Sequence, residues 1–159
     1  MISSESVDKA CAEVNAYTDD RMMKEFDGFF KEQPSICDFI TELTSESSLQ
    51  IQELSLFLSY MIFKTIKMAQ SDVLNTVTSE SIEAAYHESE SWIDRINEEG
   101  DDAQIPADPE PFLTQYVISE LNQPLEDGKL LQDEEKGEVF FVLKTVISSL
   151  TRSPLGQVI

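Results

Sequence analysis

Four side chains that can bind a divalent cation recur at helical spacing in the second half of the sequence. Steps of four, three and four residues separate Glu83, His87, Glu90 and Asp94. On a helix this spacing places all four on one face, where carboxylate oxygens and an imidazole nitrogen can bind Mg²⁺ or Mn²⁺. Asp19 or Asp20 on an equivalent earlier helix could supply further carboxylates, as in helical bundles that act on phosphorylated substrates. The same spacing also occurs on the solvated face of an ordinary acidic helix.

Other catalytic chemistry has few candidates in this sequence. His87 is the single histidine, so an activated serine or cysteine nucleophile has one candidate base. The five glycines are isolated and form no phosphate-binding loop. Cys11 and Cys37 have no CxxC spacing and lie in apolar helical patterns, which favours buried thiols over a disulfide or a zinc site. A role without catalysis is therefore the favoured interpretation.

Three amphipathic aromatic residues, Tyr17, Tyr86 and Trp92, suit either the edge of a core or the centre of an interface. If the helices that carry them lie side by side on the outside, they form an apolar centre with an acidic rim. Such a surface fits a basic amphipathic helix of a partner protein.

The charge balance limits the classes of partner. Lys and Arg total 11 against 31 Asp and Glu, a net charge of −20. We therefore expect no attraction to nucleic acid or to an anionic membrane. The expected partner is another protein with a basic or apolar surface, or a second copy in a homodimer. Solubility alone explains the same charge, and so does a DNA mimic that presents carboxylates to a nucleic-acid-binding protein.

Two segments are apolar nearly all the way round a helical wheel, residues 54–63 and 139–143. A helix of this kind must be covered on most sides by other elements, and both are shorter than the roughly 20 residues that span a membrane. The full pattern predicts an all-α domain of six helices around these two. The predicted helices begin or end near the following positions: 5–31, 34–43, 47–69 with a Ser47 and Gln50 capping box, 79–99, 108–121 and 133–152.

The six predicted helices also repeat as two sets of three, over residues 5–70 and 79–152. Apolar positions align with offsets of 75, 77 and 80 residues that grow only at predicted loops. Any two amphipathic helices can be aligned in this way, and the most specific match is a Lys-Thr pair at 64–65 and 144–145. The acidic, proline-containing segment 98–111 is the predicted linker.

Two lysines and one glycine lie in or beside the two apolar segments. Lys64 and Lys144 follow the two apolar segments, where they either form a paired anion site or extend to solvent and complement the helix C-termini. Gly137 indicates a close approach of two helices.

The N-terminal residues lack the basic and apolar regions of a signal peptide, so we expect a cytoplasmic protein. The favoured function is a non-catalytic protein–protein interaction module, an acidic adaptor or chaperone-like protein. The alternatives are a metal-dependent enzyme that uses Glu83, His87, Glu90 and Asp94, and an acidic DNA mimic.

Overall fold

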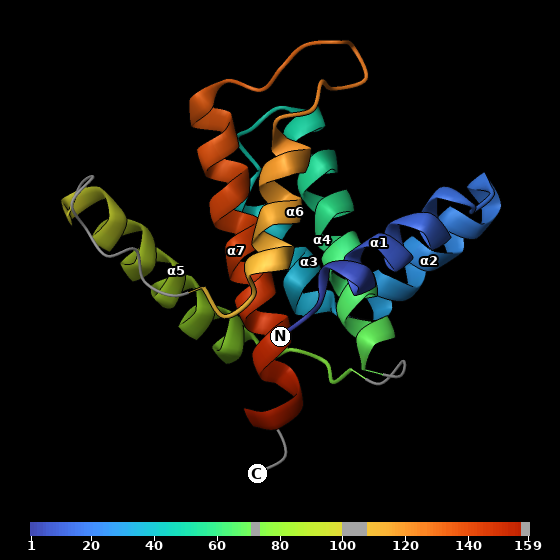
Figure 1. The fold of residues 1–159 in the computed structure, drawn as a ribbon, viewed down its shortest axis with the longest axis horizontal. Helices are drawn as coiled ribbons and strands as arrows, with labels where there is room; N and C mark the ends of the chain where they lie inside the picture. The colour runs from blue at the N-terminus through green and yellow to red at the C-terminus, as the bar shows by residue number, and fades with distance from the viewer. Residues whose placement is uncertain (71–73, 100–107, 157–159) are drawn as a thin grey trace.

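Seven helices make up the secondary structure of the described residues, and these residues contain no strand. The structure is a computed structural model that describes residues 1–70, 74–99 and 108–156. Figure 1 shows the helices, which are α1 (Ser4–Asn15), α2 (Asp19–Glu32), α3 (Pro34–Leu43), α4 (Leu49–Ala69), α5 (Ser79–Glu99), α6 (Pro111–Leu121) and α7 (Asp133–Gly156). The prediction of an all-α fold is confirmed.

The predicted helix 5–31 is instead two helices, so the predicted count of six was wrong. The chain breaks at residues 16–18, where Thr18 takes an extended conformation (φ −73°, ψ 164°) and its hydroxyl accepts a hydrogen bond from the Arg21 N–H. Asp19 and Asp20 then fill the first turn of α2, where carboxylates stabilise the positive end of a helix. Thr18, Asp19 and Asp20 are a recognisable helix start in the sequence. The prediction missed it because apolar residues recur at helical spacing both before and after these three residues.

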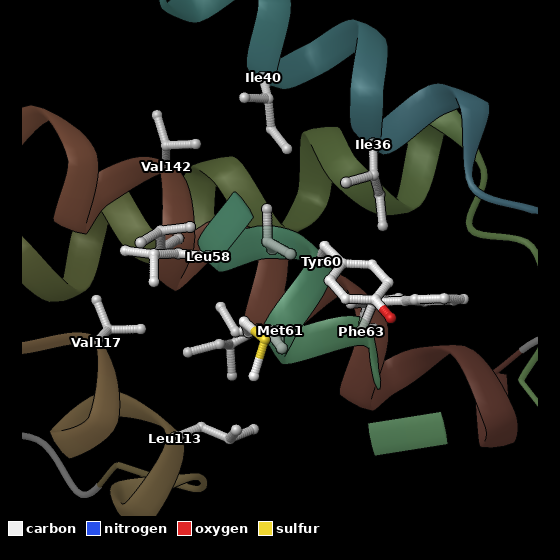
Figure 2. Close-up of a cluster of buried hydrophobic side chains, with 14 of the residues drawn as sticks. Ile36, Ile40, Leu58, Tyr60, Met61, Phe63, Leu113, Val117 and Val142 are labelled. Atoms are coloured by element: carbon white, nitrogen blue, oxygen red, sulfur yellow. The ribbon is translucent and has the colours of Figure 1, made fainter. Parts of the chain in front are cut away.

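Helices α4 and α7 pack against each other at the centre of the molecule (Figure 1). Leu58, Tyr60 and Ile62 of α4 are fully buried, as are Val139 and Leu143 of α7. Figure 2 shows the core around α4, to which neighbouring helices contribute Ile36, Ile40, Leu113, Val117 and Val142. The two apolar segments thus form central helices, as predicted.

The outer helices surround this central pair in a paired arrangement. Helix α1 contacts α4 and α6, whereas α5 contacts α7 and α3. Helix α3 also packs on α4, and α6 packs on α7. Consequently α5 lies on the opposite side of the central pair from α1 and α2 (Figure 1).

Buried polar side chains tie the starts of α3 and α6 to the other half of the chain. Gln33, fully buried, accepts a hydrogen bond from the Val77 N–H (2.8 Å) and donates one to the Asn75 carbonyl (2.9 Å). Glu110 is also buried and accepts one from the Ile2 N–H (2.8 Å). Each of these residues caps a helix that begins with proline, as predicted for α3.

Several predicted helix ends differ from the structure. The N-cap of α4 is Ser48, whose hydroxyl accepts from the Ile51 N–H, while the Ser47 hydroxyl donates to Glu138. Helix α6 begins at Pro111 rather than 108, because Asp108 caps the Glu110 N–H outside the helix.

Helix α7 continues past Pro154 to Gly156, where it was expected to stop before residue 153. Gly137 is exposed, and a Cβ atom added there would meet nothing within 4 Å, so the predicted close helix approach was wrong. Residues 100–107 of the predicted linker lie outside the described residues.

Candidate functional site

The four residues predicted to bind a metal lie exposed on α5. His87 has 65% of its side chain exposed, and its two nitrogens lie 4.0 Å from carboxylate oxygens of Glu83 and Glu90. Among the described residues no three His, Cys, Asp or Glu side chains are grouped so that they could hold a metal ion. A metal site on α5 stays a prediction.

The predicted second set of metal ligands was wrong in its placement. Asp19 and Asp20 lie in the first turn of α2, across the central helices from α5 (Figure 1). The two helices pack on different central helices, so these carboxylates cannot share an ion with Glu83 or Glu90.

The three predicted interface aromatics do not form one surface. Tyr17 lies between α1 and α2 with the Arg21 guanidinium 4.6 Å from its ring centre. On the opposite side, Tyr86 packs edge to face on Phe141 (5.0 Å between ring centres), and Trp92 lies under the Lys144 ammonium (4.8 Å). The shared surface was therefore wrong, because α5 packs on α7 rather than beside α1 and α2. An interface role for each residue separately stays a prediction.

Lys64 and Lys144 each bind a carboxylate of their own, so neither predicted role was right. The Lys64 ammonium lies 3.1 Å from Glu13, and the Lys144 ammonium lies 2.9 Å from Asp108. The Lys144 side chain is only 6% exposed and does not extend to solvent. The two ammonium groups therefore bind α1 to α4 and the segment before α6 to α7, instead of forming an anion site.

The two carboxylates respond to these lysines. The hydrogen bond from Lys64 lowers the pKa of Glu13. Burial alone would raise the pKa of Asp108, but hydrogen bonds from Lys144, Thr114 and the Glu110 N–H together hold it below its ordinary value. Both carboxylates are thus ionised partners in structural pairs.

Cys11 and Cys37 are free thiols, as predicted. Burial raises the pKa of Cys37 to about 12, and burial is also the largest cause of the raised pKa of Cys11. Thiols of this kind are poor nucleophiles, because the thiolate is the reactive form.

A groove of about 630 Å³ lies between α2, α4 and the segment that ends α6. Its apolar walls come from all three elements: Phe26 and Phe30 from α2, then Leu54, Leu56 and Phe57 from α4, then Pro124 and Leu125 after α6. Phe30 is 40% exposed and Phe57 is 36% exposed. Large side chains so close together and so exposed typically mark a binding surface.

One wall of the groove is α2, whose second half packs along α4 from Phe26 to Glu32, which binds Lys67 (2.7 Å). Phe29 is the one buried residue of α2 among its described side chains, and it packs on Phe63 with 5.0 Å between ring centres. Phe26 lies between Tyr60 of the core (5.0 Å) and Phe57 of the groove (6.3 Å). The groove is therefore continuous with the core and rests on a fixed base.

Carboxylates and amides also line the groove. Glu53, Glu120 and Glu126 line it together with Gln50 and Gln123, and no lysine, arginine or histidine is among its described lining residues.

Asp127 extends this acidic rim. It accepts hydrogen bonds from the Lys129 N–H (3.0 Å) and the Gln50 amide (3.4 Å), and both lower its pKa. An apolar groove with an anionic rim is the result.

The sequence contained an indirect signal for this groove. The segment 54–63 was predicted to be covered on most sides, and Phe57 within it is 36% exposed. Leu49 at the start of the same helix is 68% exposed. The apolar positions of α2 read as ordinary core positions, because the break between α1 and α2 was not identified.

Comparisons with known protein families, with curated proteins and with solved structures found no match for this chain. Within the part of the chain that the structure describes, the helices are too short or too polar to cross a membrane.

Proposed function

We propose that this chain is a non-catalytic protein-interaction module and that the groove between α2, α4 and the end of α6 is its binding surface. The observation that carries the proposal is the exposure of Phe30 and Phe57 on the walls of one apolar groove. Aromatic side chains presented in this way are typical anchors of protein interfaces.

The distribution of polar groups favours a protein over a small molecule. Small-molecule sites place a few convergent polar groups inside apolar walls. Here Gln50, Glu53, Gln123 and Glu126 are all exposed, so the polar groups lie at the rim, as in protein interfaces. The free thiols Cys11 and Cys37 agree with our further proposal that the module acts in a reducing compartment such as the cytoplasm.

An unbiased phage-displayed peptide library, selected on the intact protein, tests this function. We expect the recovered peptides to compete with one another and to lose at least about tenfold in affinity for Phe57→Asp, because a buried anchor is worth about 2 kcal/mol or more. Ile118→Asp is the matched control, since Ile118 is 47% exposed on α6 but does not line the groove. Peptides that bind both variants equally would contradict the proposal.

We also propose that the helices are two related halves around a pseudo-twofold axis between α4 and α7. Matching contacts support this proposal: Gln33 and Glu110, 77 residues apart, share a backbone conformation (φ −131°, ψ 59° and φ −130°, ψ 65°). Their bonded amides, Val77 and Ile2, are 75 residues apart.

Further pairs repeat with the same offsets. The hydroxyls of Ser3 and Thr78 each accept from the N–H three residues later, at 3.1 Å. Thr65 and Thr145, 80 residues apart, each donate to the carbonyl four residues earlier. The halves differ where α1 and α2 replace the continuous α5.

A circular permutant tests the duplication. If α7 relates to α1 as α4 relates to α5, a chain opened at residues 71–73, with Ile159 joined to Met1 by a flexible linker of about nine residues, should fold. We expect circular dichroism to show native helix content and a cooperative thermal transition. Loss of the native helix content or of the cooperative transition would contradict the proposal that the two halves are equivalent. A permutant with a longer linker is the control.

A further inference from the structure

We infer that the partner segment that binds the groove is a cationic amphipathic helix. This inference rests on the proposed function and adds the chemistry of the partner. It follows from the spacing of the apolar walls, from the state of the backbone around them and from the sign of the rim.

The apolar walls present side chains at helical spacing. Phe26 and Phe30 lie one turn apart on α2, and Leu54 and Phe57 lie one turn apart on α4. Two parallel rows of this kind accept a third row of side chains spaced three or four residues apart, which is the pattern of a helix in a groove.

The backbone of the walls favours a helical ligand over an extended one. An extended peptide gains affinity by adding to an exposed strand edge. The long walls here are helices, whose backbone N–H and C=O groups bond within the helix. A ligand that satisfies its own backbone hydrogen bonds, as a helix does, loses least on entering such a groove.

The rim selects the sign of the ligand. Glu53, Glu120 and Glu126 come from three separate segments, and Asp127 adds a fourth carboxylate next to Gln50. Lys136 donates to Asn122 (3.0 Å), and Lys129, whose charge contributes to the lowered pKa of Asp127, is not among the described lining residues of the groove. Lysine or arginine residues flanking the apolar face of a helix would find these carboxylates opposite them.

The same charge argues against a second copy of this chain as the occupant. Two copies would each bring a net charge of −20, and like charges facing one another across an interface cost several kcal/mol. A cationic partner instead gains from that field over about 8 Å at physiological ionic strength.

Three fluorescein-labelled synthetic peptides of about 16 residues test the inference by fluorescence anisotropy with the intact protein. The first places leucine and tryptophan on one helical face and lysine on the other. The second has the same composition in scrambled order, and the third replaces each lysine of the first by glutamate. We expect the first to bind at least about tenfold more tightly than either of the others at 0.15 M salt.

Two matched triple variants locate the charge effect. Glu53→Gln, Glu120→Gln and Glu126→Gln together should weaken the cationic peptide about tenfold and flatten its salt dependence. The control triple Glu83→Gln, Glu90→Gln and Asp94→Asn removes the same net charge from exposed positions of α5 and should change affinity less than about twofold.

The outcomes separate the two proposals. If the glutamate peptide binds as tightly as the lysine peptide, and Phe57→Asp abolishes that binding, the partner chemistry is overturned while the groove function stands. If the scrambled peptide binds equally, or both triple variants act alike, bulk charge explains the binding and the inference is overturned. A library that yields no groove-dependent peptide overturns the proposed function itself.

Discussion

Replacing Lys144 by Met should lower the free energy of unfolding by about 3–5 kcal/mol, as expected when one member of a buried ion pair is removed. The Lys144 side chain is 6% exposed and that of Asp108 is 16% exposed, so the remaining carboxylate would lose its cation in a place that water reaches poorly. The Trp92 ring would also lose the ammonium that lies 4.8 Å from its centre. Urea unfolding followed by circular dichroism measures the loss.

Two controls separate the ion pair from packing. Lys144→Met combined with Asp108→Asn should recover at least about half of the loss, because no charge then remains unpaired. Lys64→Met should cost only about 1 kcal/mol, since its partner Glu13 is 42% exposed. Equal losses for Lys64→Met and Lys144→Met would show that the second pair is not buried in solution.

The pH dependence of the same variants has a defined sign. The folded pKa of Asp108 lies below its ordinary value of 3.8, so its contribution to stability is present above that value. The contribution is lost as the pH falls through the folded pKa. Without Lys144 the burial that raises the pKa remains, so the stability of Lys144→Met should fall less between pH 5 and pH 3 than that of the unmodified chain, by about 1 kcal/mol or more.

Replacing Leu58 by Ala should lower the free energy of unfolding by about 2–5 kcal/mol. Leu58 is fully buried at the centre of α4, among residues of α3, α6 and α7 that fix its surroundings (Figure 2). Because interiors are close-packed, the cavity left by three carbon atoms closes only in part. The same urea titration measures this loss.

Leu49→Ala provides the comparison for Leu58→Ala. Leu49 is in the same helix but is 68% exposed, so its replacement should change stability by less than about 0.5 kcal/mol. A loss well under 2 kcal/mol for Leu58→Ala, or equal losses for the two variants, would contradict a central position for α4.

The sequence predicted the central helices because their chemistry is local. A segment such as 54–63, apolar nearly all the way round, has no stable place except under other elements, whichever way the chain turns. Phe141 belongs to the second apolar segment but is only partly buried, and its ring packs on Tyr86 of α5. A continuous apolar run does not show which of its residues will be the least covered.

The groove and the ion pairs depend on angles between helices, which residue patterns do not encode. The break at Tyr17 and Thr18 gives α2 a direction of its own, and the Thr18 cap was readable only once a break in the predicted helix 5–31 was considered. Likewise Lys144 meets Asp108 because the segment that precedes α6 lies beside the middle of α7. Spacing within one helix predicted a shared face for Glu83, His87 and Glu90, but not whether anything would cover that face.

The paired arrangement gives the groove a structural reason. In the proposed pairing of the two halves, α5 is one continuous helix on one side, and the equivalent length on the other side is divided into α1 and α2. The division places Phe26 and Phe30 over only part of α4 and leaves Phe57 partly uncovered. We therefore propose that the difference between the halves is where the binding function resides.

Mapping by ¹⁵N NMR during titration with the lysine peptide tests whether this groove binds a cationic amphipathic helix. We expect the largest amide shifts on α2, on the first half of α4 and on residues 120–127. Shifts centred on Glu83, His87 and Glu90 of α5, or spread evenly over all acidic surfaces, would contradict it.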